Sequence, residues 1–240
     1  MSRSTREIAN PDGHDTKHAL GLDLGQSNDP SALTVVRELT PYRKRKERKR
    51  PMGPALEITK ETGRPHYAVV WIERFELGTP YTEIVDRVAH VQDYPRENHV
   101  PLVMDATGVG APVVDMFKEK GAAPKQITFT GGQQVQSDMD RHSVPKKDLA
   151  TTIQALLQTG RLKIAEELPH AETLVREMKT FRVKIADSGH ARFEHASESD
   201  TDDILMSLAC ALWFMQYGSG LPDAPRSQQT TDWGRHMPGM

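Results

Sequence analysis

The sequence predicts a mixed α/β fold, in which a central sheet carries helices on both faces. Strand-like segments come first, short apolar segments then alternate with amphipathic helical segments, and the last regular segment is a strongly apolar helix. Antiparallel-looking strands followed by strand–helix alternation are typical of a sheet whose later strands run parallel. The length of 240 residues fits one large domain.

Three strands open the predicted sheet. Residues 18–24 (HALGLDL) and 32–39 (ALTVVREL) are joined by the turn GQSNDPS. Residues 67–77 (YAVVWIERFEL) are rich in β-branched and aromatic side chains, which favour strands. We therefore expect the first three strands to pair antiparallel.

Helices and short strands alternate over the rest of the domain. Apolar residues at helical spacing predict a helix over 82–92, and proline near the start with glycine after the end predicts helices over 111–120 and 145–159. The other expected elements are strands at 100–105 and 125–129, a helix at 170–181, a hairpin of 182–185 with 191–195, and a final helix at 202–217.

Three segments interrupt this pattern. Residues 1–17 and 218–240 are polar, so we expect a flexible N-terminal segment and a disordered tail on either side of a domain at 18–217. Residues 41–65 contain four prolines and a basic run, which predicts a surface loop inserted into the domain.

Charge is distributed unevenly along the chain. Residues 43–50 (RKRKERKR) hold seven basic residues and one acidic residue, a net charge of +6, whereas the rest holds 24 basic and 32 acidic residues, a net charge of −8. The chain is therefore an acidic body with one basic segment. One use of such a run is to bind a nucleic acid, and neutralising the run would then weaken that binding and flatten its salt dependence. Docking on an acidic partner and a merely solvated loop are the alternatives.

Membrane association and cysteine chemistry are not expected. The apolar stretches are too short to cross a bilayer, and the N-terminus has no apolar signal-like region. The single cysteine, Cys210, has apolar neighbours, which predicts a small core residue rather than a disulfide or a zinc site. We expect a cytoplasmic protein.

Acidic residues stand where the predicted elements meet. Asp23 lies in an apolar strand, Asp105 ends another, and Asp202 and Asp203 open the last helix. Carboxylates at the ends of buried strands are costly unless they share a cation or line a cleft. Several at one edge suit Mg²⁺ or Mn²⁺ better than zinc. Local roles remain open: Asp23 as a turn residue, Asp105 as an acceptor for loop amides, and the other two as helix-start residues.

Four segments of the sequence are informative together: GLDLGQSNDPSALTVV, VPLVMDATGVGAPVVDMF, VPKKDLATTIQALLQTGRLKI and SDTDDILMSLACALW. They resemble, in the same order, the nuclease domain of phage large terminase subunits. The resemblance covers roughly residues 18–217, and its most specific parts are the GVG after Asp105 and the DD before the apolar helix. It implies an RNase H-like mixed sheet.

The resemblance also implies a catalytic site. Asp23, Asp105 and Asp203 look like its metal ligands, with Asp202 as the substitute for Asp203 and Asp29 as an auxiliary carboxylate. Two Mg²⁺ or Mn²⁺ ions would activate a water and stabilise the leaving 3′ oxygen, so no protein nucleophile is needed.

Basic residues are expected to contact phosphates without reading bases. Lys146 and Lys147 match a basic position of the family, although a solvated first helical turn is an equal alternative. The other expected DNA contacts are Arg141 and, in the basic run, Arg43, Lys44 and Arg45. His142 and His195 are candidates for proton transfer or have no role.

The implied activity is a metal-dependent endonuclease that cuts concatemeric double-stranded viral DNA during bacteriophage genome packaging, in the host cytoplasm. The chain has no G-x-x-x-x-G-K-[ST] phosphate loop, so the ATPase motor of full-length terminases is missing. We expect a free-standing nuclease, a split terminase component or an excised domain. A separate terminase ATPase, the small terminase and the portal are candidate partners.

Three alternatives stay open. A Holliday-junction resolvase or another RNase H-like nuclease would keep the fold and change the substrate. A non-catalytic packaging or DNA-binding module would leave DNA intact with or without metal. GLDLGQSN also resembles the first phosphate-binding turn of actin-like and sugar kinases, but that fold needs two such domains and 240 residues are too few.

Overall fold

The structure is a computed structural model that describes residues 7–25, 29–48, 56–93, 100–185, 191–194 and 201–218. The tail expected at 218–240 lies outside the described residues from residue 219 on, as do residues 1–6 of the expected N-terminal segment. Within the described ranges, no helix is long and apolar enough to cross a membrane.

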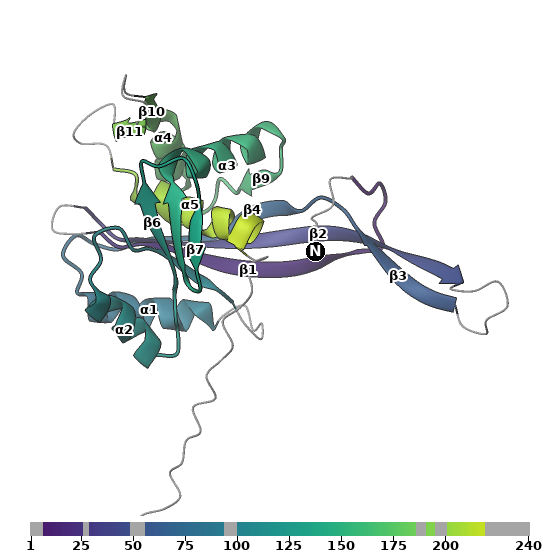
Figure 1. Cartoon of the computed structure of the whole chain (residues 1–240), viewed down its shortest axis with the longest axis horizontal. Helices are drawn as coiled ribbons and strands as arrows, with labels where there is room; N and C mark the ends of the chain where they lie inside the picture. Colours follow the sequence, from purple (N-terminus) through teal and green to yellow (C-terminus); the bar gives the residue numbers. More distant parts are fainter. Residues whose placement is uncertain are drawn as a thin grey trace, which may run out of the picture.

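One sheet forms the centre of the molecule (Figure 1). Its strands lie in the order β7-β8-β6-β5-β1-β2-β4-β9, with β3 paired to β2. The strands β1, β2 and β4 pair antiparallel, whereas β1, β5, β6 and β8 pair parallel. The predicted fold class, antiparallel strands first and parallel strands afterwards, is confirmed. The strands are β1 (Gly13–Asp23), β2 (Ala32–Arg48), β3 (Leu56–Thr62), β4 (His66–Arg74), β5 (Leu102–Asp105), β6 (Lys125–Thr130), β7 (Gln136–Asp138), β8 (Arg141–Pro145) and β9 (Leu162–Ile164).

Helices cover both faces of the sheet (Figure 1). Side chains alternate along β1, so Ala19 packs on one face while Leu20 and Leu22 pack on the other. The helices on the Leu20 face are α1 (Tyr81–Gln92) and α2 (Ala111–Glu119), and those on the Ala19 face are α3 (Lys146–Gln158), α4 (Ala171–Thr180) and α5 (Asp203–Tyr217). The predicted hairpin forms as β10 (Arg182–Ile185) and β11 (Ala191–Glu194).

Helix α5 lies directly on β1. A Cβ atom at Gly21 would come within 1.8 Å of the Ser207 carbonyl oxygen, so no side chain fits between this strand and the helix. Cys210 of the same helix is fully buried, as the sequence predicts. This close contact fixes where the N-terminal end of α5 lies relative to the carboxyl end of β1.

The segment expected to be a surface loop at 41–65 is mostly strand. Residues 42–48 of β2 pair antiparallel with residues 56–62 of β3, and we call these two strand segments the arm. The arm extends away from the body of the molecule (Figure 1). Strand β1 is longer than the predicted strand at 18–24. It begins at Gly13, and its residues 13–17 pair with β2 as far as Tyr42.

The sequence did not reveal the arm because its strands lack the usual signal. A half-buried strand alternates apolar and polar residues, whereas residues 43–48 are all charged. The strands β7, β8 and β9 were also not predicted, since segments of three to five residues are too short to show a period.

Candidate functional site

Asp23 and Asp105 end neighbouring parallel strands. The register pairs Leu22 of β1 with Met104 of β5, so the next residues along the two strands are Asp23 and Asp105. Alternation along the strands turns both away from the α1 face and toward the face covered by α5. The two carboxylates therefore share one edge of the sheet, as their positions in the sequence suggested.

The surroundings of Asp23 are strongly acidic. Burial raises the pKa of its carboxyl well above the ordinary value, and the negative charges of Asp105, Asp202, Asp203 and Asp29 raise it further, in that order. The other four acidic residues selected from the sequence therefore all lie close enough for their charges to act on Asp23.

Asp105 has a local hydrogen bond as well as acidic neighbours. Its Oδ1 accepts a hydrogen bond of 2.7 Å from the Thr107 backbone N–H, so the local role that the sequence left open is present. Burial raises the pKa of Asp105 to about 6, while Thr107 and the charge of Lys146 lower it and the charge of Asp202 raises it. This carboxyl therefore titrates close to neutral pH.

The two acidic residues that open α5 have different surroundings. Asp202 is the N-cap residue, but its side chain makes no capping hydrogen bond. Asp203 is 3% exposed and forms a two-pronged ion pair with Arg74 at the end of β4, with Nε–Oδ2 and Nη2–Oδ1 distances of 2.8 and 3.0 Å. The same Arg74 guanidinium donates a hydrogen bond of 2.8 Å to the Thr201 hydroxyl.

Glu177 of α4 contacts the first turn of α5. Its Oε2 accepts a hydrogen bond of 2.8 Å from the Leu205 N–H, while Oε1 is buried with no partner among the described residues. Burial raises the pKa of Glu177 to about 8; the Leu205 bond and the Arg74 charge oppose this, and the nearby aspartates add to it. The side chain is therefore mostly neutral at pH 7.

Sequence reasoning missed both Arg74 and Glu177. Arg74 stands two residues after Ile72 in a strand, and Glu177 stands three residues after Leu174 in a helix. Both spacings place a charged residue on the face that carries a buried apolar one. Both residues could have been recognised in the sequence as charged residues on a face that is otherwise buried.

The basic residues expected near DNA are separated by the fold. Lys146 begins α3, directly after β8, and its charge acts on Asp105. Lys147 follows it in the first turn of α3. Arg141 begins β8, at the end of that strand opposite Lys146, so the structure does not bring it to the acidic edge.

Of the two histidines suggested for proton transfer, His142 does not join the site. His142 is 2% exposed, and its ring centroid lies 5.5 Å from that of Trp213, in the core between β8 and α5. His195 lies outside the described residues.

A cleft of about 530 Å³ lies beside the acidic edge. The segments that follow β1, β4 and β5 line it, including Gly25, Asp29, Tyr81, Gly108 and Gly110. As the described side chains stand, no three His, Cys, Asp or Glu residues surround a common point that could hold a metal ion.

No protein-family model and no curated protein matches this sequence. The fold does match a solved structure, the large terminase nuclease from thermophilic phage G20c. The TM-score is 0.52 at 18% sequence identity, and the match covers 90% of this chain and 93% of that chain. The chain has the fold of a phage large terminase nuclease domain.

Two further structures show the same terminase nuclease fold. The G20c nuclease with bound magnesium matches with a TM-score of 0.52 at 19% identity, over 88% of this chain and 90% of that one. The nuclease domain of the large terminase from Thermus phage P74-26 matches with a TM-score of 0.50 at 18% identity, over 92% and 94%. The resemblance found in the sequence is therefore borne out at the level of the fold.

Proposed function

We propose that this chain is a metal-dependent endonuclease of the terminase type, which hydrolyses phosphodiester bonds of double-stranded DNA. The observation that carries the proposal is the placement of Asp23 beside Asp105 at one edge of a terminase nuclease fold, with the start of α5 adding Asp202. Like charges held together at a partly buried edge are unfavourable, and a divalent cation would relieve this repulsion.

The donor set fits Mg²⁺ or Mn²⁺. Asp23, Asp105 and Asp202 offer carboxylate oxygens, which hard divalent cations prefer, and Asp29 is an auxiliary carboxylate. When bound, a pair of such ions supplies an activated water and stabilises the leaving oxygen of the phosphodiester.

We place Asp202 ahead of Asp203 in this set. The Asp203 carboxylate is held by Arg74, whereas the charge of Asp202 raises the pKa of both Asp23 and Asp105. Asp203 then acts as a positioning residue, because its pair with Arg74 attaches the first residue of α5 to the end of β4.

Contact with DNA is assigned to basic residues at the same edge. Lys146 lies close enough to Asp105 to lower its pKa, and an ammonium group there can bind a phosphate beside the reacting one. Lys147 is the next residue of that helical turn. Such contacts carry no sequence information, so cutting without base preference is expected.

The fold shared with phage terminase nucleases is what suggests the biological setting. Such a nuclease would cut concatemeric viral DNA during genome packaging, in the cytoplasm of the host. A terminase ATPase, the small terminase or the portal would bring it to the DNA.

The test is cleavage of supercoiled plasmid by the full chain with Mg²⁺, Mn²⁺ or EDTA. Wild type is compared with Asp105→Ala and with Asp115→Ala, a control that removes an exposed carboxylate paired with Lys118 on α2. We expect nicking and linearisation that need the metal, are lost in Asp105→Ala and persist in Asp115→Ala.

Two results would contradict this proposal. Cleavage of branched DNA but not of plasmid would indicate a junction resolvase. Intact DNA of both kinds under all conditions would indicate a non-catalytic packaging or DNA-binding module.

A further inference from the structure

We infer that the arm is a second contact for duplex DNA, one helical turn or more away from the acidic edge, and that it binds through the face carrying Tyr42, Lys44 and Lys60. The substrate class rests on the proposed function. The choice of face and the distance come from the strand register and the contacts of the arm.

The register divides the basic run between two faces of the arm. It pairs Lys44 with Lys60 and Arg43 with Glu61, and successive residues of a strand point to opposite faces. We call the first face, with Tyr42, Lys44 and Lys60, the lysine face. The other face carries Arg43, Arg45 and Glu61.

Charges on the other face are already engaged within the protein. Arg45 forms an ion pair with Glu61 at 3.2 Å. The Arg43 guanidinium donates to the carbonyl oxygens of Ala9 and Asn10, which ties the arm to the segment before β1. Two of the three arm residues expected to contact DNA therefore have partners. The exposed Arg45 pair could open for a phosphate, but the Glu61 carboxylate beside it would repel that phosphate.

The lysine face presents two ammonium groups around one aromatic ring. The Nζ atoms of Lys60 and Lys44 lie 3.8 and 5.9 Å from the centroid of the Tyr42 ring. The ring packs over Gly13, where a Cβ would meet its hydroxyl at 2.6 Å. Two exposed ammonium groups beside one aromatic ring offer positive charge for the phosphates of a duplex.

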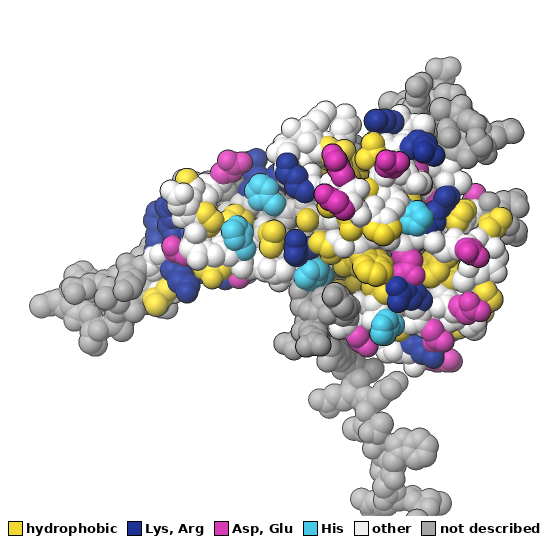
Figure 2. All heavy atoms as spheres, turned by 180° about the vertical axis from the view of Figure 1, so that it is seen from behind, with side chains coloured by type: hydrophobic (Ala, Val, Ile, Leu, Met, Phe, Trp, Pro, Cys, Tyr) yellow, Lys and Arg dark blue, Asp and Glu magenta, His cyan; other side chains and the backbone are white. Residues whose placement is uncertain are grey.

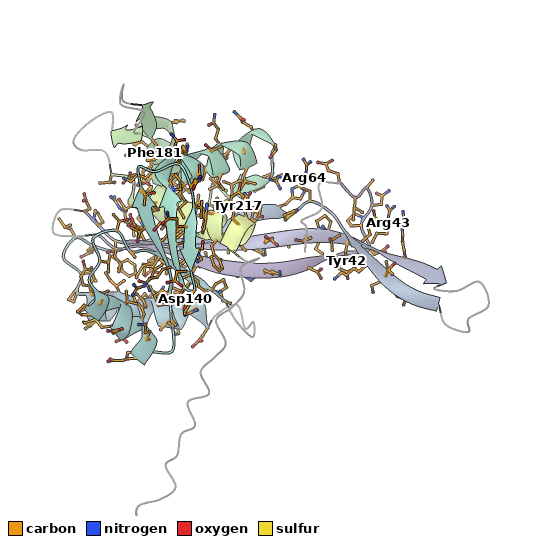
Figure 3. The ribbon with its side chains drawn as sticks, viewed as in Figure 1. Tyr42, Arg43, Arg64, Asp140, Phe181 and Tyr217 are labelled. Atoms are coloured by element: carbon orange, nitrogen blue, oxygen red, sulfur yellow. The ribbon has the colours of Figure 1, made fainter. Side chains whose placement is uncertain are left out.

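An ion pair of Lys60 with Asp15 does not prevent this use. The two side chains are 41% and 44% exposed, and pairs at such exposed sites contribute little to stability. The Lys60 ammonium can therefore exchange Asp15 for a phosphate. Figure 3 shows Tyr42 and Arg43 where the arm leaves the body, and Figure 2 shows Lys and Arg side chains gathered along the arm.

The distance to the acidic edge follows from β1. This strand runs from Gly13 to Asp23, and Gly13 pairs with Tyr42. Ten steps of about 3.3 Å separate the two ends of β1, roughly 33 Å, which is about one turn of B-form DNA. Alternation places Gly13 and Asp23 on the same face of the strand, and α5 packs on this face between them, at Gly21, so a duplex that contacts both ends passes over this helix.

The first test measures DNA binding by the full chain in EDTA, with a fluorescent duplex of about 40 base pairs and anisotropy at several salt concentrations. The variant Lys44→Ala/Lys60→Ala is compared with Lys118→Ala/Lys120→Ala, which removes the same charge from the α2 side, where these lysines pair with Asp115 and Asp86. We expect the arm variant to reduce the slope of log affinity against log salt by about 2, and the control to leave it unchanged. An unchanged slope in the arm variant, as docking on an acidic protein would give, overturns the inference.

A second test separates the arm from the nuclease activity. Cleavage with Mg²⁺ is compared on duplexes of about 8 and about 40 base pairs. At about 3.4 Å per base pair the shorter duplex is roughly 27 Å long, less than the separation of the two contacts, so only the longer one can span both. We expect the arm variant to cut the short duplex like wild type and to lose the preference for the long one. The same length preference in both proteins overturns the inference. If wild type cuts neither duplex but the salt slopes differ as expected, the proposed nuclease function fails and the arm contact stands.

Discussion

Arg74 and Asp203 form the most enclosed ion pair of the described residues near the acidic edge. Asp203 is 3% exposed and the Arg74 side chain is 26% exposed. A buried pair adds little net stability, but removal of one partner leaves a charge buried without compensation. The structure therefore makes Arg74 important for stability although it stands at the end of a strand.

Replacement of Arg74 by methionine is expected to lower the free energy of unfolding by about 3 kcal/mol, because Asp203 stays buried and unpaired. Urea denaturation in EDTA measures this. The control Arg87→Met removes a more exposed pair with Glu73 and should cost less than about 1 kcal/mol. If both variants lost the same free energy of unfolding, the Arg74–Asp203 pair would not have the role assigned to it. The double variant Arg74→Met/Asp203→Asn should recover part of the loss, because it no longer buries an unpaired carboxylate.

The asparagine variants of Asp202 and Asp203 separate a metal ligand from a positioning residue. Asp202→Asn should keep its stability in EDTA and lose most of the rise in melting temperature that Mg²⁺ or Mn²⁺ produces. Asp203→Asn should be destabilised in EDTA, because the Arg74 guanidinium loses its anion. A stable Asp203→Asn protein without a metal response would instead make Asp203 the ligand.

Glu177 is expected to make stability depend on pH. Its pKa is about 8 in the folded protein and near the ordinary 4.5 after unfolding. Between these values the folded state holds a proton that the unfolded state has released, so stability falls as pH rises. Glu177→Gln stays neutral and keeps an acceptor for the Leu205 N–H.

The variant should therefore gain stability relative to wild type from pH 5 to pH 8, by at most about 1.4 kcal/mol per pH unit. Urea denaturation at several pH values in EDTA measures the difference. The other acidic residues are common to both proteins and cancel in the comparison. Parallel curves would show that Glu177 is ionised in the folded state.

At the scale of elements, the contact between β1 and α5 holds the site together. The strand carries Asp23, and the helix begins at Asp203, directly after Asp202. At Gly21 the strand and the helix meet closely because this residue has no side chain, and a Cβ here would overlap the backbone of Ser207. A backbone carbonyl cannot move without its helix, so any side chain here displaces α5.

Gly21→Ala is expected to lower the free energy of unfolding by at least about 2 kcal/mol and to weaken the metal response, since the start of α5 moves. The control Gly78→Ala has open space around the new Cβ and meets only the strain of a φ of 85°, about 1 kcal/mol. Denaturant unfolding with and without Mn²⁺ measures both effects. A loss no larger than that of the control would show that the helix accommodates the methyl group.

At the scale of the whole molecule, the arm is separate from the core. Among the residues whose burial the structure describes, no buried hydrophobic residue lies between 43 and 61. The body therefore does not need the arm to fold, and the arm can be removed as a unit.

Replacement of residues 43–61 by Asn-Gly joins Tyr42 to Thr62, a pair already opposite each other in the register, through a two-residue hairpin turn. We expect a melting temperature close to that of wild type and unchanged cleavage of a short duplex. Affinity for a long duplex should fall, with a flatter salt dependence. A shortened protein that unfolds or loses short-duplex cleavage would show that the arm supports the body.

Much of the fold could be predicted because its signals are local. Apolar strands that end in Asp23 and Asp105, the helical spacing of 82–92 and the apolar run of α5 all act over a few neighbouring residues. The arm escaped prediction for the same reason. Residues 43–48 are all charged, so no alternation of apolar residues marks the first strand of the arm.

The sequence by itself determined the order of the helices and of the longer strands of the body, the edge where Asp23 and Asp105 lie and the acidic start of the last helix. Only the tertiary structure decided which charges meet. Arg74 and Asp203 are 129 residues apart, Glu177 and Leu205 are 28 apart, and the register of the arm separates Lys44 from Arg43 and Arg45. Local patterns show which side of an element is buried, but the partner of a buried charge depends on which faces pack together, and that is a property of the whole fold.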